Sequence, residues 1–338
     1  MRRILVVNVN WIGDVIFSSP VFKALKTEYP EARISCLAVP RVREILESIP
    51  FIDDIIMYDE EGRHWSPLAK LALILRLRRK KFDAAFLLHR SLTRALLVYW
   101  AGIPRRVGYD EKGRGRYLTH RSEFPGSDVH RGDHYLNIIE SYGVKVEDRQ
   151  CRLNVCPEAA RYVAALLNAE NIRDGDFVVA VNPGGNWDLK RWPHDRFSLL
   201  ISRVLEQLQA KVVVTGAAKD ASWNRKVMAP LKVKPVDLTG KTSLKQLMAV
   251  FTRADVVVSA DSGPLHLASG VGTDVIGLFG PTRPEITGPR GAGRSVVIQQ
   301  DVGCNREPCY HIKCPDNTCM QAITVDDVIE QIKHLRNT

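Results

Sequence analysis

The stretch that decides the fold is RRILVVNVNWIGDVIFSSPVFKALKTEYPEARISCLAV, residues 2–39. It opens with a short β-branched run at residues 4–9, continues with helical apolar spacing over residues 20–29, and returns to an apolar run at residues 34–39. The two apolar runs are continuous rather than alternating, which indicates burial on both faces and hence a parallel sheet covered by helices. This strand–helix–strand unit predicts a doubly wound α/β domain.

The same alternation of apolar runs and helical segments continues along the chain. We expect further strands at residues 54–58, 84–88, 177–181, 211–215, 236–238, 255–259 and 275–279. A single hydrophobic core stops growing near 250 to 300 residues, roughly, and this chain has 338. Two Rossmann-like domains are therefore expected.

The boundary between the domains is expected near residue 172. A helical segment at residues 158–169 is followed by the polar residues 171–176, which include a glycine. This divides the chain into residues 1–172 and 173–338. The last segment, residues 324–335, has acidic residues in its first turn and basic residues in its last, as a helix favours. It could pack back across the N-terminal domain.

Composition and charge indicate an anionic partner. The chain holds 48 Lys and Arg against 38 Asp and Glu, a net charge of +10. Residues 62–121 alone hold 15 basic residues against three acidic ones, an excess larger than that of the whole chain. Nucleic acid, acidic lipid and phosphorylated sugar all fit such a surface.

No segment of the sequence is typical of a secretion signal or a membrane span. The opening apolar run, residues 4–7, is shorter than the roughly 7 to 15 residues of a signal core. No window approaches the roughly 18 uninterrupted apolar residues of a membrane helix. We therefore expect a cytoplasmic protein whose membrane contact, if any, is peripheral, at the cytoplasmic face of the inner membrane.

Three polar or glycine-rich segments follow predicted strands, where parallel sheets bind ligands. They are NWIGD at residues 10–14, NPGGNWDLKRWP at residues 182–193, and ADSGPLH at residues 260–266. We expect all three to face one cleft between the domains. Neither a G-x-G-x-x-G after the first strand nor a P-loop occurs, so nicotinamide and P-loop chemistry are disfavoured.

The third segment has the features of an anion-binding helix start. Asp261 or Ser262 can cap the helix, and Gly263 admits close approach of a ligand. Free backbone N–H groups there could hold a pyrophosphate. An ordinary capped helix explains the same residues equally well, and His266 is compatible with a packed side chain.

The first two segments offer a cation and a carboxylate. Lys190 and Arg191 could neutralise charge on a departing diphosphate, although exposed loop residues are common in such positions. Asp14 could accept a proton from an acceptor hydroxyl. Its other interpretation is a helix N-cap without a catalytic role.

Taken together and in order, these segments resemble the bacterial ADP-heptose:lipopolysaccharide heptosyltransferases of glycosyltransferase family 9, over essentially the whole chain. Within this family the chain is most similar to the heptosyltransferase II branch. The similarity lies at residues 108–109, at residues 114–119 and at the cysteines between residues 304 and 319. The segments that carry the resemblance are residues 4–14, 183–184 with 190–193, 216–220, 238–244, 261–266 and 279–282. The resemblance implies a GT-B fold and an inverting, metal-independent transfer that needs no cofactor.

The resemblance also implies substrates and residue roles. The donor would be ADP-L-glycero-β-D-manno-heptose, and the acceptor would be the anionic Kdo–lipid A inner core of lipopolysaccharide. Asp14 would be the general base, and Lys190 would bind the donor phosphates. The remaining donor site would comprise Asp220 near the ribose, Thr242 near the adenine, and Asp261, Ser262, Gly263 and His266.

The basic stretch then has a use, because Arg can grip carboxylates and phosphates through two hydrogen bonds at once. The candidate acceptor contacts are Arg63, Arg90, Arg94, Arg114, Arg116 and Arg121. A solvated helix face is the alternative for residues 76–81, where a charge run commonly means exposure or attraction to a membrane surface.

Four cysteines recur every five residues, at Cys304, Cys309, Cys314 and Cys319. Their spacing differs from the C-x₂-C pairs of zinc ribbons, so we expect a structural or incidental role and no metal site.

Two other functions stay open from the sequence. A nucleotide-sugar epimerase shares the two-domain architecture, and a nucleic-acid-binding protein would use the basic stretch. The basic residues are not interleaved with aromatic ones in a stacking pattern, which disfavours nucleic acid.

Overall fold

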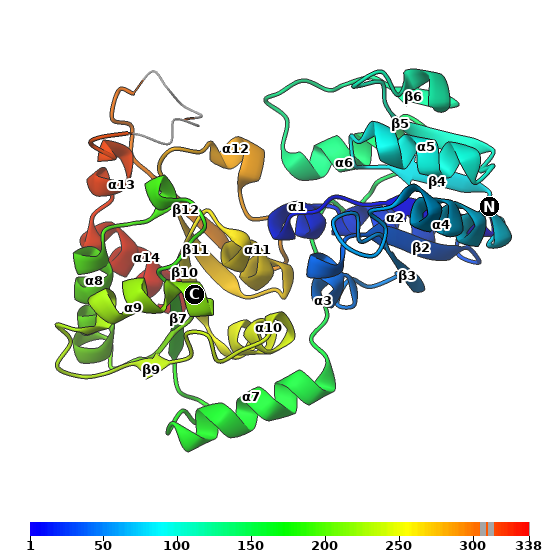
Figure 1. Ribbon diagram of the computed structural model, residues 1–338. Helices are drawn as coiled ribbons and strands as arrows, with labels where there is room; N and C mark the ends of the chain where they lie inside the picture. Colours follow the sequence, from blue (N-terminus) through cyan, green and yellow to red (C-terminus); the bar gives the residue numbers. More distant parts are fainter. Residues whose placement is uncertain (305–308, 310–313, 338) are drawn as a thin grey trace. The chain divides into compact units, whose positions relative to one another are not determined.

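The computed structural model describes residues 1–304, 309 and 314–337 (Figure 1). They divide into two compact units, Met1–Asn154 and Val155–Thr338. No helix within the described ranges is both long enough and apolar enough to span a bilayer.

The first unit is built on six parallel strands in the order β3-β2-β1-β4-β5-β6. Apart from Arg3 at the start of β1, the central strands β1 and β4 are apolar and buried, as helix-covered parallel strands are. The strands are β1 (Arg3–Val7), β2 (Arg33–Ala38), β3 (Asp54–Met57), β4 (Ala84–Leu87), β5 (Arg105–Tyr109) and β6 (His120–Ser122). The helices and 3₁₀ turns are α1 (Ile12–Phe17), α2 (Ser19–Glu28), η1 (Pro40–Val42), α3 (Arg43–Leu46), α4 (Pro67–Arg79), α5 (Leu92–Trp100), η2 (Gly115–Tyr117) and α6 (Arg131–Glu140).

The second unit repeats this plan with the order β12-β11-β10-β7-β8-β9, again all parallel. Its strands are β7 (Val178–Asn182), β8 (Lys211–Val214), β9 (Val236–Asp237), β10 (Val256–Ala260), β11 (Asp274–Phe279) and β12 (Ser295–Gln299). Its helices and 3₁₀ turns are α7 (Pro157–Ala169), η3 (Asp188–Lys190), α8 (His194–Gln207), η4 (Ala218–Asp220), α9 (Ala221–Met228), α10 (Leu244–Arg253), α11 (Gly263–Gly270), α12 (Pro284–Thr287), α13 (Thr318–Ala322) and α14 (Val325–Asn337).

Both sheets are wound outward from the middle, so the predicted pair of doubly wound α/β units is confirmed. The chain leaves β1 towards β2 and β3, and then returns to the other side of β1 with β4. The second unit does the same around β7 and β10. Connections on the two sides of such a switch point diverge, and this leaves a crevice at the carboxyl ends of the two strands.

The sequence analysis did not predict three of the strands, because their residues do not form continuous apolar runs. β5 carries Arg105, Arg106 and Gly108, β6 is three residues long and starts with a histidine, and β12 has an exposed face. All three lie at or next to a sheet edge, where one or both faces contact solvent. The capping box at Ser243 and Gln246 starts α10 through reciprocal hydrogen bonds.

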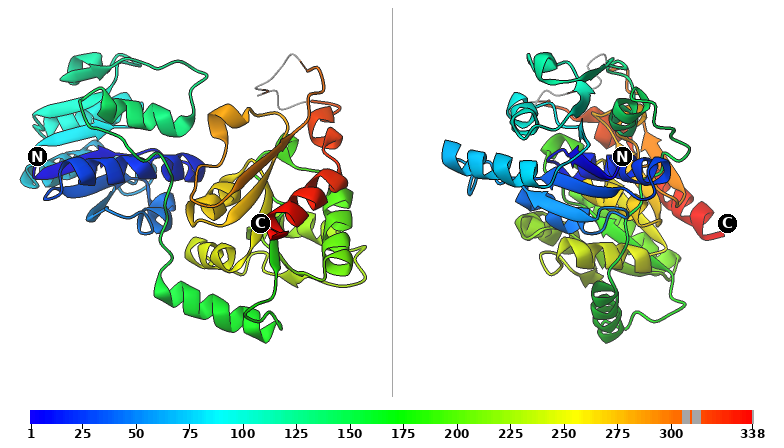
Figure 2. Two further views of the ribbon diagram at one scale, coloured as in Figure 1. Left: turned by 180° about the vertical axis from the view of Figure 1, so that it is seen from behind. Right: turned by 90° about the vertical axis from the view of Figure 1, so that its right-hand side faces the viewer.

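The division of the chain differs from the predicted join near residue 172. Helix α7 packs on α10 and so lies in the second unit. The last helix, α14, buries Val328, Ile329 and Ile332 in the core of the second unit, beside α8 and β11. Figure 2 shows α14, in red, among the elements of the second unit, and the expectation that it also packs on the N-terminal domain stays a prediction.

Two arginines of the basic stretch are structural parts of the first unit. Arg94, on α5, is fully buried, and its guanidinium donates to Asn8 O at 2.8 Å and Asn10 Oδ1 at 2.9 Å. It also pairs with Glu60 at 3.3 Å. Arg114 is equally buried and donates to the main-chain carbonyls of Tyr109 and His89. These bonds fix the loops that follow β1, β4 and β5.

Arg94→Ala should lower the free energy of unfolding by about 3 kcal/mol, because it leaves a cavity and an unpaired buried carbonyl at Asn8. Arg121→Ala is the matched control. Its side chain is 60% exposed, so its cost should stay within about 0.5 kcal/mol. Urea unfolding measures both, and equal effects would contradict the structural role of Arg94.

Candidate functional site

A pocket of about 230 Å³ lies at the switch point of the first unit. It forms where the loop after β1 meets the loop after β4, with α6 closing one side. The lining residues are Val9, Asn10, Trp11, Asp14, Leu88, His89, Arg90, Tyr109, Lys112, Arg131, His134 and Tyr135. The first predicted segment therefore contributes to a cavity within its own unit.

Asp14 projects into this pocket from the first turn of α1. The N-cap of α1 is Trp11, and no side chain caps the helix, so the alternative reading of Asp14 as an N-cap is wrong. Instead Asp14 Oδ1 accepts a hydrogen bond from the hydroxyl of Tyr135 on α6 at 2.8 Å. Burial, and then the charge of Asp14, raise the pKa of Tyr135 well above its usual value. Tyr135 thus remains a donor that orients the carboxylate.

The pocket carries positive charge from three side chains. Arg90, Lys112 and Arg131 line it, and the Arg90 guanidinium also lies 3.4 Å from Glu111 and above the Phe124 ring. An anionic ligand would therefore find cations next to Asp14.

The two histidines of the pocket stay neutral. Burial, followed by the charges of nearby arginines, lowers the pKa of His89 to about 3 and that of His134 to about 4. His89 Nδ1 accepts from Ser91 N at 3.1 Å, which leaves the ring proton on Nε2. At neutral pH, His89 can therefore donate a hydrogen bond without adding charge.

Of the six arginines predicted to bind the acceptor, only Arg90 lines the pocket. Arg94 and Arg114 are fully buried and bind main-chain oxygens, so the structure gives them a supporting role in place of the predicted one. The other three are exposed: Arg63 in the β3–α4 loop, Arg116 against the Tyr117 ring, and Arg121 beside Asp110.

The sequence analysis missed the residues that α6 and the β5–β6 connection bring to the pocket. Arg131, His134 and Tyr135 stand at i, i+3 and i+4 and so share one face of α6. This spacing was the available signal, but Asp133, Asn137 and Glu140 on the same helix obscure it. Only the packing of α1 on α6 shows that this face meets Asp14.

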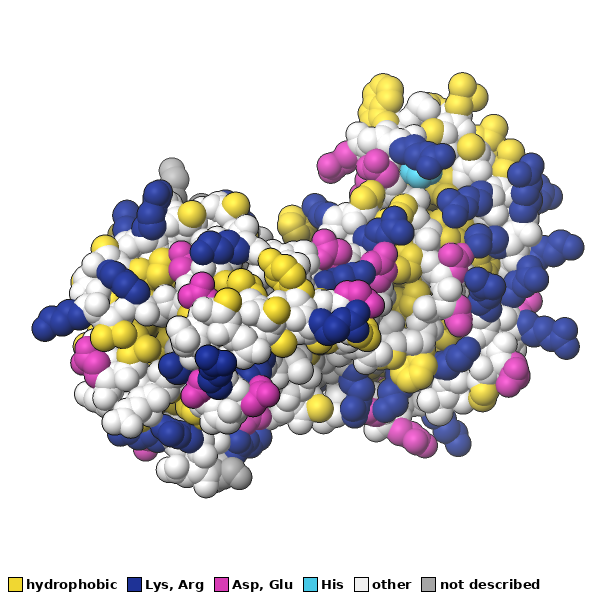
Figure 3. All heavy atoms as spheres, turned by 90° about the horizontal axis from the view of Figure 1, so that it is seen from below, with side chains coloured by type: hydrophobic (Ala, Val, Ile, Leu, Met, Phe, Trp, Pro, Cys, Tyr) yellow, Lys and Arg dark blue, Asp and Glu magenta, His cyan; other side chains and the backbone are white. Residues whose placement is uncertain are grey.

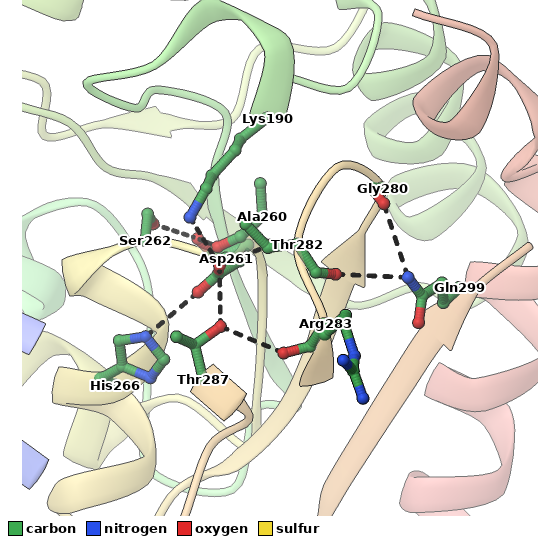
Figure 4. Close-up of polar contacts among 11 residues, drawn as sticks. Lys190, Ala260, Asp261, Ser262, His266, Gly280, Thr282, Arg283, Thr287 and Gln299 are labelled. Carbon is green, nitrogen blue, oxygen red and sulfur yellow. Dashed lines mark hydrogen bonds and ion pairs between the residues drawn. The ribbon is translucent and has the colours of Figure 1, made fainter. Parts of the chain in front are cut away.

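In the second unit, Asp261 is the centre of a buried polar cluster (Figure 4). It directly follows β10, and its side chain is 4% exposed. Its Oδ2 lies 2.6 Å from Lys190 Nζ and accepts from Thr282 at 2.7 Å and Thr287 at 3.1 Å. Its Oδ1 lies 3.3 Å from His266 Nε2.

The members of the Asp261 cluster come from segments that follow the central strands of the second sheet, with His266 on α11 and Thr287 on α12. Lys190 follows β7, Asp261 follows β10, and Thr282 follows β11. The predicted second and third segments are therefore brought together. The carboxylate contacts Lys190 and does not cap α11, which disfavours the reading of that segment as an ordinary capped helix.

Asp261 is held in its charged form. Burial opposes ionisation, but the hydrogen bond from His266 and the charge of Lys190 outweigh it, and the pKa of Asp261 lies well below its usual value. Asp261 is thus suited to hold Lys190 in place and unsuited to accept a proton near neutral pH.

The other predicted donor residues lie in the same unit. Ser262 is the N-cap residue of α11 and Gly263 is its first residue, and the Ser262 hydroxyl lies 3.1 Å from that of Ser259. Asp220 is buried after β8, where its Oδ2 accepts from Ala217 N at 3.0 Å. A side chain at Gly184 would collide with Asp220. Thr242 is half-buried, next to the start of α10.

The late cysteines are all unbridged. Cys309 is buried, Cys304 is exposed, and Cys314 Sγ accepts from Asn317 N at 3.4 Å. Among the described residues, no three His, Cys, Asp or Glu side chains are grouped so as to hold a metal ion.

Asp261→Asn should lower the free energy of unfolding by about 2 to 4 kcal/mol at pH 7, because it leaves Lys190 beside an uncharged group. The folded-state pKa lies below the unfolded value of about 3.9, so this stability is present above that pH and is lost as the pH falls further. The difference from wild type should therefore shrink only below about pH 4.

Asp174→Asn, at an exposed site, is the control and should change the stability little. Urea titrations over a pH series supply the test. A stability difference between wild type and Asp261→Asn that vanishes already at pH 6 would contradict the assignment.

Comparison with known proteins shows the family. The profile of glycosyltransferase family 9 (heptosyltransferase) matches residues 70–319. A relative from Escherichia coli K12 named lipopolysaccharide heptosyltransferase 2 is 26% identical over 314 residues, which cover 85% of each chain. A relative from Haemophilus influenzae named lipooligosaccharide heptosyltransferase 2 is 27% identical over 316 residues, covering 85% of this chain and 86% of its own.

Solved structures show the same fold. A family 9 glycosyltransferase from Veillonella parvula superposes with a TM-score of 0.87 at 24% identity, covering 99% of this chain and 97% of its own. ADP-heptose LPS heptosyltransferase II of Escherichia coli superposes with a TM-score of 0.81 at 24% identity, covering 99% and 98%. The α/β fold of the GT-B class is thus confirmed, and the chain belongs to glycosyltransferase family 9, the heptosyltransferase family, and is a glycosyltransferase.

Proposed function

We propose that this chain transfers heptose, with inversion, from ADP-L-glycero-β-D-manno-heptose to the inner core of lipopolysaccharide, as a heptosyltransferase II. The observation that carries the proposal is the Asp14–Tyr135 pair in a cationic pocket. The names of the relatives, several of which are heptosyltransferases 2, support the substrates. In this proposal the first unit binds the acceptor and the second binds the donor.

The first-unit pocket suits an anionic sugar acceptor. Arg90, Lys112 and Arg131 would bind its carboxylates or phosphates, and the neutral His89 and His134 would not compete for them. Arg63, Arg116 and Arg121 are exposed in the same unit and could extend this contact to a larger acceptor. The lipid part of such an acceptor favours a peripheral contact with the inner membrane.

Asp14 would act as general base. Its carboxylate takes the proton of an acceptor hydroxyl as that oxygen attacks the anomeric carbon of the heptose. The bond from this carbon to the diphosphate oxygen breaks, ADP leaves with the bonding electron pair, and the configuration inverts. Tyr135 occupies one carboxylate oxygen and so fixes how the other oxygen is presented.

The Asp261 cluster would hold the leaving diphosphate. Lys190 supplies positive charge, and the start of α11 at Ser262 and Gly263 supplies backbone N–H groups. Asp261 and His266 position Lys190 and the helix start rather than react themselves. Asp220 and Thr242 would lie towards the nucleoside, since both follow strands on the β8–β9 side of the same sheet.

Asp14→Asn should lower kcat by at least about a hundredfold, because a general base contributes roughly 10²- to 10⁴-fold. Affinity for ADP should stay within about twofold, since the donor half is untouched. The measurements are acceptor-dependent ADP release and calorimetric titration with ADP.

Glu31→Gln, which neutralises an exposed carboxylate of the same unit, is the control and should retain full activity. An Asp14→Asn enzyme with ordinary turnover would refute the base assignment. Heptose modification without acceptor would instead favour an epimerase.

Tyr135→Phe should lower kcat about tenfold with little change in either KM, because it frees the carboxylate without removing it. In the Asp14→Asn background the same change should have no further effect on the residual rate. Steady-state kinetics on the four proteins of this cycle test the coupling. Additive losses would show that Tyr135 acts independently of Asp14 and would contradict the proposed positioning role.

A further inference from the structure

Helix α4 of the first unit is apolar on two faces. One face carries Leu73, Ile74 and Leu77, which are buried in the core with residues of α5. The other carries Leu68, Leu71 and Leu75, which are 79%, 50% and 44% exposed. Their spacing of three and four residues places them in one stripe along the helix.

Such an exposed stripe is unusual for a surface helix, which normally has a single apolar face turned to the core. Trp65, which precedes the N-cap residue Ser66, is 74% exposed and extends the apolar stretch along the chain. Contiguous exposed apolar surface commonly marks an interaction site. We call Trp65, Leu68, Leu71 and Leu75 the α4 stripe.

The α4 stripe is accompanied by charge of one sign. Residues 62–82 contain seven Lys or Arg and no Asp or Glu. Arg76, Arg78 and Arg79 are exposed near the end of the helix, and none of them pairs with a carboxylate of the described residues. Lys80 differs, because its ammonium pairs with Asp54 at 2.7 Å. Figure 3 shows apolar and basic side chains next to one another at the margin of the first unit.

We propose that α4 docks the protein on an anionic lipid bilayer. The α4 stripe would enter the boundary between headgroups and acyl chains, with Trp65 at headgroup depth. Arg76, Arg78 and Arg79 would contact lipid phosphates. The helix has 13 residues, fewer than the roughly 20 needed to cross the hydrocarbon core, so it lies along the membrane surface.

The sign of the charges favours lipid over a protein partner. Residues 62–82, which include the whole of α4, carry only positive charges, and this matches a surface of uniform negative charge. In the right-hand view of Figure 2, the light-blue helix α4 projects from the side of the first unit.

This inference rests on the peripheral contact of the proposed function but not on the role of Asp14. Binding is measured by sedimentation with phosphatidylcholine vesicles that contain or lack phosphatidylglycerol, without any sugar. The wild-type protein should bind the anionic vesicles, and this binding should weaken as the salt concentration rises. Replacement of Arg76, Arg78 and Arg79 by Gln should lower the partition coefficient about a hundredfold, since each basic residue contributes about 1 kcal/mol.

Replacement of Leu68, Leu71 and Leu75 by Ser should lower the partition coefficient at least about tenfold through lost apolar burial. Leu199→Ser, at an exposed site of the second unit, is the control and should bind as wild type. Both triple variants should keep full turnover on a soluble, deacylated acceptor, and Asp14→Asn should bind vesicles normally. Failure of the membrane proposal, measured by vesicle binding, can therefore be distinguished from failure of the proposed function, measured by turnover.

Three results would overturn the proposal. The first is that the wild-type protein does not bind anionic vesicles. The second is that the triple variants bind these vesicles as well as the wild type does. The third is that light scattering shows an oligomer for the wild type and a monomer for the leucine variant. The α4 stripe would then join copies of this chain.

Discussion

The buried parallel sheet is the constraint on which the rest of this structure depends. Strands covered on both faces carry mainly apolar side chains, so charged groups that could bind a ligand gather in the segments at their carboxyl ends. At the switch points these loops diverge and leave room for a ligand. Asp14 follows β1 beside the loop after β4, and Lys190 follows β7 beside Asp261 after β10. The two candidate sites thus occupy equivalent positions in their own sheets.

The two carboxylates Asp14 and Asp261 lie in different environments. Asp14 is half-buried, lines an open pocket and has one oxygen bound to a tyrosine. Asp261 is enclosed by a lysine, a histidine and two threonines that keep it charged. A carboxylate that is reached by ligand can exchange a proton, whereas one compensated in this way serves to hold its neighbours. This contrast supports Asp14 as the base and Asp261 as the anchor of Lys190.

Three groups of basic residues within the stretch 62–121 lie in physically different surroundings. Arg94 and Arg114 are buried and bind main-chain oxygens that shape the pocket loops. Arg90 and Lys112 line the pocket itself. The arginines of α4 remain in solvent beside exposed leucines. The excess of positive charge therefore contributes to folding and, in our proposals, to ligand binding and to attachment to a bilayer.

The sequence by itself determined the two doubly wound units and the positions of Asp14, Lys190 and Asp261, because strand periodicity and the loop after each strand are local properties. Tertiary structure alone decided that Tyr135, 121 residues away, would reach Asp14, and that Lys190 would pair with Asp261. It also decided that Arg94 would be buried while Arg76 is exposed, and that α14 would pack within the second unit. The physical reason is that spacing along the chain fixes which residues share an element or a face. Which charges lose their water, and which partners they meet, depends on elements that come together only when the chain folds.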